Sequence, residues 1–356
     1  MKSPSLTKEA QKEEKDVSGG DFCFQKALNE VTSGFPERSR SIILMRYGIS
    51  QKNPKTLEEI GNSYRVTRER IRQIIREVIK KVEEKKENPI LQEVSRKITF
   101  TVNEKSGIIK KKELIKLLGK GNEKESGAVE FFLDCLKDPV MAETKGEMEE
   151  SCIRIEFDLD YWKKIKDIAK NVLEAEGKPI NDDELAKKIL LQVPAITRKK
   201  LFDYLAPSKE IVKNNFGKWG LDNWPEITPK GTREKAYLML KESDRPLHFR
   251  EVASLIDHYK LSKKKTHPQT VHNELIKDSR FVLVGRGVYA LSSWGYKKGT
   301  VKEVLEEILK NNKGPMKRGD ILNQILKVRQ VKKSTVIINL NNFFLKTGRD
   351  EYTIRR

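Results

Sequence analysis

Cysteine is scarce in this chain of 356 residues, which has only Cys23, Cys135 and Cys152. They form no C-x-x-C spacing and are too few for a disulfide framework, so we expect neither a secreted disulfide scaffold nor a zinc finger. Long apolar runs are also missing, since none approaches the about 18 residues of a membrane helix. The first 20 residues are polar and charged, unlike a signal peptide. We therefore expect a cytoplasmic protein without a membrane partner.

Apolar residues make up 37% of the chain and charged residues 35%, which is lean for one large α/β core but sufficient for a string of small helical domains. The length predicts about two or three domains, and more if they are small. The net charge of +20 disfavours an ordinary neutral enzyme.

The positive charge is concentrated at the two ends of the chain. The net charge is +5 for residues 1–90, zero for 91–228 and +15 for 229–356. This distribution suggests two surfaces that favour a polyanion, with a neutral spacer between them. Lys-rich helices that only keep the protein soluble are the alternative, and the charge by itself does not separate the two.

A pattern of about 70 residues recurs four times after residue 89. Each copy has a helix, a short polar turn, a second amphipathic helix, a third helix and a β-prone pair around glycine. The second helices and the turns ahead of them are expected in 106–118, 177–189, 245–256 and 314–325. The β-prone pairs are expected in 140–155, 211–224, 281–294 and 343–354. Three helices followed by a β-hairpin describe a winged helix-turn-helix.

The predicted fold is therefore mainly α, with an N-terminal helix-turn-helix domain followed by tandem winged-helix modules. The predicted domains are a disordered arm (1–20), a helix-turn-helix domain (21–88) and four winged-helix modules: module 1 (89–158), module 2 (159–228), module 3 (229–297) and module 4 (298–356).

Residues 54–82, PKTLEEIGNSYRVTRERIRQIIREVIKKV, have the pattern of a helix-turn-helix. Thr56 and Glu59 form a capping box that opens a short helix, and Thr67 can cap the next helix. Gly61 permits the close approach of a second helix. On the second helix the apolar spacing predicts a buried stripe, made of Ile71, Ile74 and Val78.

The opposite face of that second helix is cationic but also contains a carboxylate and an amide. It comprises Arg68, Glu69, Arg72, Gln73, Arg76 and Lys80. A helix that only binds phosphate needs positive charge alone. Glu, in contrast, accepts a hydrogen bond from cytosine N4, and Arg or Gln can make two hydrogen bonds to guanine or adenine. The mixture favours a recognition helix in the major groove. An Arg-rich interaction surface without DNA is the alternative.

The segments PERSRSIILMRYGI (36–49) and PKTLEEIGNSYRVTRERIRQI (54–74) resemble region 4 of the primary sigma factor family of bacterial RNA polymerase, over residues 25–84. In that family the domain reads the −35 promoter element and packs on the polymerase flap. The resemblance implies that three residues contact bases: Arg68, Glu69 and Gln73. It also implies that a second set contacts the DNA backbone: Thr56, Leu57, Thr67, Arg70, Arg72 and Arg76.

Two departures from the family are visible. Ile75 stands where the family usually has an acidic residue, which indicates extra packing on this side of the helix. No segment resembles the aromatic-rich promoter-melting region, so we do not expect this chain and core polymerase alone to open a promoter.

Module 3 resembles the HARE-type helix-turn-helix family through PLHFREVASLI and TVHNELIKDSRFVLVGRGVYALSSWG, within residues 230–295. That family occurs in transcription-associated and chromatin-associated proteins and is proposed to touch nucleic acid or polymerase. Modules 1, 2 and 4 look like diverged relatives.

Histidines are confined to module 3, at His248, His258, His267 and His272. Their spacings match no zinc signature, so packing and surface roles are expected and no metal or cofactor is predicted. No phosphate loop is recognisable, and we expect no small-molecule substrate. Matching places in two hairpins indicate that Trp219, Trp224 and Trp294 belong to hairpin cores, although tryptophan can also stack on bases.

The sequence therefore predicts a transcription protein that is not an enzyme. It would bind double-stranded DNA sequence-specifically through its sigma-like domain and act with RNA polymerase, in the cytoplasm at the nucleoid. The alternative is a polymerase-binding adaptor with little DNA affinity of its own, and a nuclease or DNA-repair accessory is a more distant third. The DNA site, the sense of regulation, the ligand of the winged-helix modules and the oligomeric state stay open.

Overall fold

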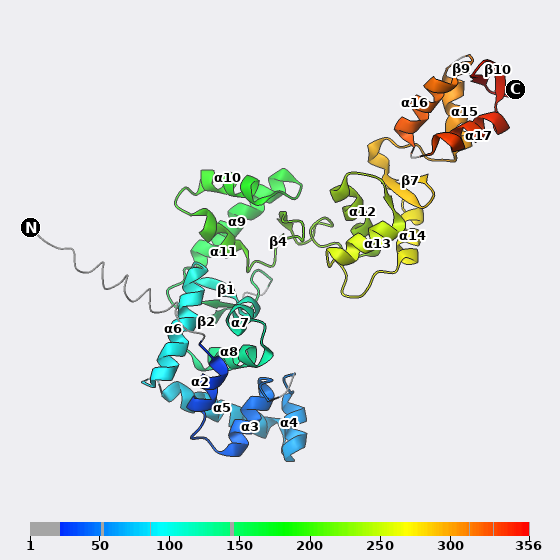
Figure 1. The fold of residues 1–356 in the computed structure, drawn as a ribbon. Helices are drawn as coiled ribbons and strands as arrows, with labels where there is room; N and C mark the ends of the chain where they lie inside the picture. Colours follow the sequence, from blue (N-terminus) through cyan, green and yellow to red (C-terminus); the bar gives the residue numbers. More distant parts are fainter. Residues whose placement is uncertain are drawn as a thin grey trace, which may run out of the picture. The chain divides into compact units, whose positions relative to one another are not determined.

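The computed structural model describes residues 22–50, 53–85, 87–142, 146–312, 314–329 and 331–355. The chain forms two compact units, the first ending at Val212 and the second beginning at Lys213. The fold is mainly helical with small antiparallel sheets, as the sequence predicts (Figure 1). The arm predicted for residues 1–20 lies outside the described residues.

The helix-turn-helix region contains α2 (Phe24–Val31), α3 (Glu37–Arg46), α4 (Leu57–Tyr64) and α5 (Arg68–Glu84). The predicted capping box is present at the start of α4, where the Thr56 hydroxyl accepts from the Glu59 amide and the Glu59 carboxylate accepts from the Thr56 amide. Thr67 caps α5 by accepting from the Arg70 amide at 3.2 Å. Both helix starts are thus set by local side-chain chemistry.

Each winged-helix module has the same order of helices followed by a hairpin. Module 1 consists of α6 (Pro89–Glu104), β1 (Ile108–Lys110), α7 (Lys111–Gly119), α8 (Glu123–Cys135), β2 (Val140–Ala142) and β3 (Ser151–Ile153). Module 2 consists of α9 (Leu159–Glu176), α10 (Asp182–Gln192), α11 (Arg198–Leu205), β4 (Ile211–Lys213) and β5 (Trp219–Leu221). Module 3 consists of α12 (Thr232–Ser243), β6 (Leu247–His248), α13 (Phe249–His258), α14 (Pro268–Lys277), β7 (Phe281–Gly285), β8 (Val288–Leu291) and η1 (Ser292–Trp294). Module 4 consists of α15 (Val301–Asn311), β9 (Met316–Lys317), α16 (Arg318–Val328), α17 (Lys333–Phe343), β10 (Leu345–Gly348) and β11 (Glu351–Thr353).

The polar turn expected ahead of each second helix is present, but in modules 1, 3 and 4 it leads into a short strand that the sequence does not predict. The strand pairs antiparallel with the last strand of the hairpin, which gives the sheet orders β1-β3-β2, β6-β8-β7 and β10-β11-β9. A segment of two or three residues is too short to show the alternation of apolar and polar residues that predicts a strand. Each of these segments buries an apolar residue, such as Leu247 or Met316, and forms the third strand of its sheet.

The helix-turn-helix region and module 1 share one hydrophobic core within the first unit. Apolar residues from α2 to α5 belong to the same buried cluster as those of α6 to α8. Helix α8 packs against both α2 and α5, and Figure 1 shows α2 and α8 side by side. The third helix of module 1 is therefore buried and is not free to enter a DNA groove.

Polar contacts hold α8 to the helix-turn-helix region as well. The Glu125 carboxylate accepts hydrogen bonds from the Phe24 amide at 2.7 Å and the Gln25 amide at 3.3 Å, at the start of α2. The Tyr47 hydroxyl donates to Asp134 at 2.7 Å, and its pKa is raised by burial and by that carboxylate. The predicted boundary between the two domains at residue 88 falls inside this shared core, between α5 and α6, and stays a prediction.

The second unit has separate cores for modules 3 and 4. The core of module 3 includes Val271 and Leu275 of α14, and that of module 4 includes Val336 and Leu340 of α17. In both modules the third helix thus has one buried side and one side toward solvent. Trp219 is buried, and Trp294 packs against the module 3 core, as expected for hairpin cores.

Candidate nucleic-acid interface

Helix α5 is held rigidly by its apolar side. Ile71, Ile74 and Val78 are buried, as the spacing predicts. Ile75, the departure from the family pattern, is buried too and belongs to the core that α5 shares with α8. The extra packing expected from this residue is therefore present. It fixes α5 from a side that a two-helix motif alone would leave open.

The opposite side of α5 is exposed to solvent, and the polar candidates lie on it. This exposed set is Arg68, Glu69, Arg70, Arg72, Gln73 and Arg76. All of them fall within the first nine residues of the helix, at the end that a helix-turn-helix directs into the major groove.

Glu69 and Arg72 form a two-point ion pair on this exposed face. Arg72 donates from Nε to Glu69 Oε2 at 2.8 Å and from Nη2 to Oε1 at 2.6 Å, while both side chains remain about half exposed. The hydrogen bonds from Arg72 lower the pKa of Glu69, so the carboxylate stays ionised and keeps its acceptor character at neutral pH. The pair therefore orients a carboxylate that can accept from cytosine N4.

Gln73 and Arg70 form a second contact beside it. The Arg70 guanidinium donates to the Gln73 side-chain oxygen at 3.2 Å, which leaves the Gln73 amide group able to donate elsewhere. Glu69 and Gln73 thus each accept hydrogen bonds from an arginine that the resemblance assigns to the DNA backbone, Arg72 and Arg70 respectively. Arg68 and Arg76 act on Glu69 through their charge and lie toward solvent on the same helix.

The remaining backbone candidates lie at the two helix starts. Thr56 and Thr67 are exposed capping residues of α4 and α5, where free backbone N–H groups and the helix dipole favour a phosphate. Leu57 is half-buried at the first position of α4 and packs against the shared core.

The turn between α4 and α5 is set by close backbone packing. The Gly61 carbonyl accepts from the Val66 amide at 2.9 Å, and a Cβ atom at Gly61 would lie 2.6 Å from the Val66 carbonyl oxygen. The close approach expected at Gly61 is therefore made by the turn rather than by the side of a second helix. Tyr64 is the last residue of α4, and Arg65 ends the helix in the left-handed conformation, at φ 53°.

Two positioning residues on α3 were not predicted from the sequence. The Arg38 guanidinium lies over the Tyr64 ring, 5.4 Å from its centre, and Arg46 donates to the Lys55 carbonyl at 3.2 Å. These contacts tie α3 to both ends of α4. Their sequence signal is only a pair of arginines on a neighbouring helix, which does not reveal what they touch.

We expect Gly61→Ala to destabilise the first unit by about 1–3 kcal/mol, because the added methyl group meets a backbone carbonyl that cannot move without shifting the start of α5. Thermal denaturation followed by circular dichroism measures this. Asn62→Ala, an exposed change one residue further along α4, is the matched control and should leave stability nearly unchanged. Equal stability of the two variants would contradict the close packing of this turn.

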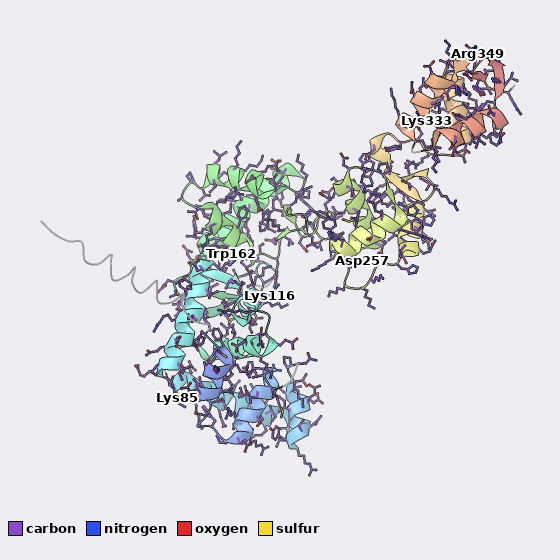
Figure 2. All side chains as sticks on the ribbon, viewed as in Figure 1. Lys85, Lys116, Trp162, Asp257, Lys333 and Arg349 are labelled. Atoms are coloured by element: carbon purple, nitrogen blue, oxygen red, sulfur yellow. The ribbon has the colours of Figure 1, made fainter. Side chains whose placement is uncertain are left out.

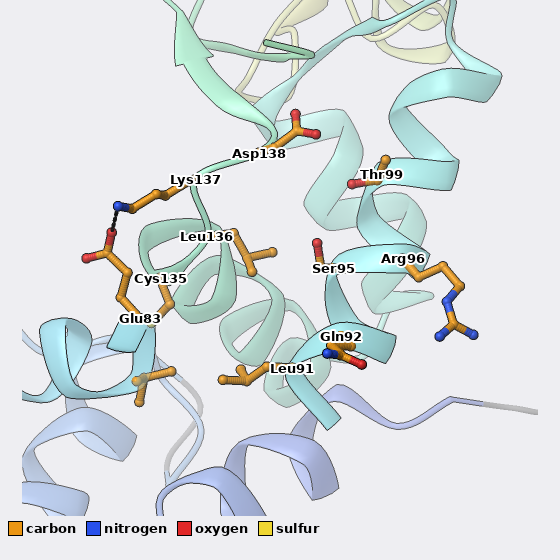
Figure 3. A pocket seen from close by; sticks show the side chains of 11 residues that line it. Glu83, Leu91, Gln92, Ser95, Arg96, Thr99, Cys135, Leu136, Lys137 and Asp138 are labelled. Atoms are coloured by element: carbon orange, nitrogen blue, oxygen red, sulfur yellow. Dashed lines mark ion pairs between the residues drawn. The ribbon is translucent and has the colours of Figure 1, made fainter. Parts of the chain in front are cut away.

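A pocket of about 550 Å³ lies between the end of α5, α6 and the segment that follows α8 (Figure 3). Glu83 and Lys137 form an ion pair of 3.3 Å at its edge. Cys135 lies in its lining, but burial raises the pKa of this thiol, so it stays protonated at neutral pH and is a poor nucleophile. The pocket therefore offers no activated group from this cysteine.

Histidine rings in module 3 pack on aromatic neighbours. The His272 ring centre lies 4.6 Å from that of Phe249 and 5.8 Å from that of Tyr289, and His248 accepts from the Arg250 amide at the start of α13. Within the described residues, no group of three or more His, Cys, Asp or Glu side chains is placed to hold a metal ion. The helices of the same part of the chain are all too short or too polar to cross a membrane.

Comparison with known proteins bears directly on this helix-turn-helix. Residues 33–84 match the family model for Sigma-70, region 4. Residues 232–294 match the HARE-HTH model, a helix-turn-helix domain named in part after ASXL proteins and restriction endonucleases. Both resemblances expected from the sequence are thereby confirmed, and the two segments are a sigma-type helix-turn-helix and a HARE-type winged helix.

Two curated relatives show the extent of the similarity. The chain is 41% identical to the RNA polymerase sigma factor SigA of Nostoc sp. over 69 residues. These residues are 19% of this chain and 18% of that protein. It is 42% identical to the RNA polymerase sigma factor SigA1 of Synechococcus elongatus, also over 69 residues. These residues are 19% of this chain and 17% of that protein. The chain thus spans less than a fifth of the length of these relatives.

Proposed function

We propose that the protein reads double-stranded DNA sequence-specifically through α4 and α5 and acts with bacterial RNA polymerase in transcription initiation or its regulation. Arg68, Glu69 and Gln73 contact base edges in the major groove. The backbone contacts come from Thr56, Leu57, Thr67, Arg70, Arg72 and Arg76. The protein works in the cytoplasm at the nucleoid, by binding and without catalysis.

The observation that carries this proposal is the exposed ion pair between Glu69 and Arg72. A surface that served only to hold phosphate would gain nothing from a carboxylate at its centre, since the carboxylate repels the DNA backbone. A carboxylate oriented by an arginine instead supplies an acceptor for one particular base. The neighbouring contact between Arg70 and Gln73 places an amide beside it in the same way.

The role of polymerase rests on the similarity of residues 33–84 to sigma region 4. In this proposal the polymerase flap is the partner of the helix-turn-helix region. Module 1 supports that region through the buried helix α8, and modules 1 and 2, with their neutral charge balance, separate it along the chain from modules 3 and 4.

An adaptor that docks on polymerase and has little DNA affinity of its own is the second candidate. The close packing of α8 on the helix-turn-helix region favours it, because this packing makes that part of the first unit a rigid body suited to protein docking. The two candidates differ in whether the protein alone distinguishes one DNA sequence from another.

Selection of bound sequences from a random duplex pool separates the candidates, using the full chain with and without core polymerase. The proposal predicts that one short motif is enriched by the protein alone and that polymerase sharpens it. Enrichment only in the presence of polymerase would favour the adaptor. No enrichment under either condition would contradict sequence reading by α4 and α5 and would leave only the adaptor.

A further inference from the structure

The third helix of module 4 presents an uncharged polar face to solvent. Val336 and Leu340 bury one side of α17 in the module core. The other side is exposed and consists of Ser334, Thr335, Ile338, Asn341 and Asn342. Residues 331–349, which include α17 and the whole of the first hairpin strand, β10, contain no Asp or Glu.

Cations flank this face at both of its ends. Lys332 and Lys333 lie at the start of α17, and Lys346 and Arg349 lie in and just after β10 (Figure 2 labels Lys333 and Arg349, well apart on the module). All four are exposed. None of the four has a carboxylate partner in the part of the chain that the structure describes.

Three other cations of the same region are already neutralised. Lys297 pairs with Glu307, and Lys310 pairs with Glu306 at 2.7 Å. Arg318 pairs with Asp350 at 3.3 Å. The cations at the two ends of α17 are therefore free to meet phosphates, together with other exposed lysines of the described part of module 4, among them Lys302, which lies over the Phe343 ring of α17.

The start of α17 adds to the attraction for an anion. Among the described residues, no side chain caps this helix of 11 residues. Its first backbone N–H groups and its dipole point toward the region where Lys332 and Lys333 lie. The free N–H groups, the helix dipole and the two lysines together favour a phosphate at the start of α17. Lys346 and Arg349 favour a second phosphate at the hairpin.

Third helices in modules 1 to 3 lack this combination. Helix α8 is buried in the shared core. In α11, Arg198 pairs with Asp183 at 2.5 Å. In α14, Glu274 lies on the helix itself and pairs with Arg233 at 2.9 Å.

We propose that module 4 is a second duplex-DNA-binding site, with α17 in the major groove and the hairpin of β10 and β11 on the backbone. Asn342 and Thr335 supply hydrogen-bonding groups for base edges, and Ile338, which is 56% exposed between them, suits a thymine methyl group. Lys332, Lys333, Lys346 and Arg349 contact phosphates on the two sides of the groove. This site goes beyond the function proposed for α5 and does not depend on it.

The salt dependence of binding tests the site, with the full chain and a 40-base-pair duplex of mixed sequence. Each phosphate contact contributes about −0.9 to the slope of log K against log salt. K332Q/K333Q and K346Q/R349Q should each flatten the slope by about 1.8. K297Q/K310Q has the same charge change but removes lysines already paired with glutamates, so it should flatten the slope much less.

A crosslink identifies what α17 touches. In a mixture of the full chain, the duplex and core polymerase, a photo-crosslinking amino acid at Asn342 should form adducts with the duplex, and these should weaken in the K332Q/K333Q background. The salt dependence also has an outcome that would overturn the proposal: slopes of log K against log salt in K332Q/K333Q and K346Q/R349Q that change no more than the slope in K297Q/K310Q. Crosslinks to polymerase but not to DNA would also overturn it and would make module 4 a protein-docking site.

The test is separable from that of α5. In the R68A/Q73A background the slope differences between the module 4 variants should persist, because the two sites bind independently. If the slope differences persist but the selection from the random duplex pool enriches no motif, module 4 is a DNA site and only the function proposed for α5 is contradicted. Thermal denaturation of each variant checks that these surface changes leave folding intact.

Discussion

Replacing Arg68, Glu69 or Gln73 with alanine should cost about 1–3 kcal/mol in binding to the preferred duplex, or about 5- to 150-fold in affinity. The reason is that each change removes a contact to one base edge, while the backbone contacts persist. For Arg68 and Gln73 the loss should be largest for the matching base pair and small for unrelated duplexes. Equilibrium binding at fixed salt, with a panel of single base-pair changes in the selected site, measures it.

Glu69→Ala gives the sharpest form of this prediction. It removes a negative charge and releases Arg72, so affinity for unrelated DNA should rise while the preference at one base pair is lost. Lys80→Ala, about three turns further along α5, is the control and should weaken all duplexes slightly and alike. Equal losses on every sequence for Arg68, Glu69 and Gln73 would mean that these residues contact only the backbone.

Gly127→Ala should destabilise the first unit by about 3 kcal/mol, or by roughly 6–12 °C in Tm. A Cβ atom at Gly127 would lie well inside the contact distance of the Tyr47 carbonyl oxygen, so α8 would have to move away from the helix-turn-helix region. That movement would also disturb the hydrogen bond between Tyr47 and Asp134. Thermal denaturation followed by circular dichroism is the measurement.

Gly34→Ala is the matched control for Gly127→Ala. Gly34 lies in the same unit, its φ is not positive, and nothing lies within 4 Å of the position of its Cβ atom. Alanine there should leave stability unchanged or raise it slightly, because it restricts the unfolded chain. A Gly127→Ala variant as stable as Gly34→Ala would show that α8 and the helix-turn-helix region are not packed as described.

Much of the helix-turn-helix could be predicted because its signals are local. The capping box of Thr56 and Glu59, the cap at Thr67 and the apolar spacing of α5 each depend on residues close together in the chain. The shared core could not be predicted in the same way, because it joins Tyr47 to Gly127, which lie far apart in the sequence. A hint was present in α8, whose apolar residues Ala128 to Leu133 occupy more than one face, as in a helix buried on several sides.

The candidate site shows the same division between local and distant information. The exposed face of α5 follows from its periodicity, and the structure places all of its polar candidates there. Glu69 and Gln73 lie four residues apart on α5, yet each bonds an arginine and not the other, since an ion pair with two hydrogen bonds, such as that of Glu69 and Arg72, is stronger than a single carboxylate–amide hydrogen bond. The contacts of Arg38 and Arg46 depend on the placing of α3 and could not be predicted from spacing.

The affinity of the protein alone for its selected duplex, relative to a shuffled duplex of the same composition, tests the central claim most directly. Both affinities should be measured at one salt concentration without polymerase, because the phosphate contribution is then common to both. Reading of bases by α5 predicts a ratio of about 10³ in favour of the selected duplex. Equal affinity for the two duplexes would contradict the account.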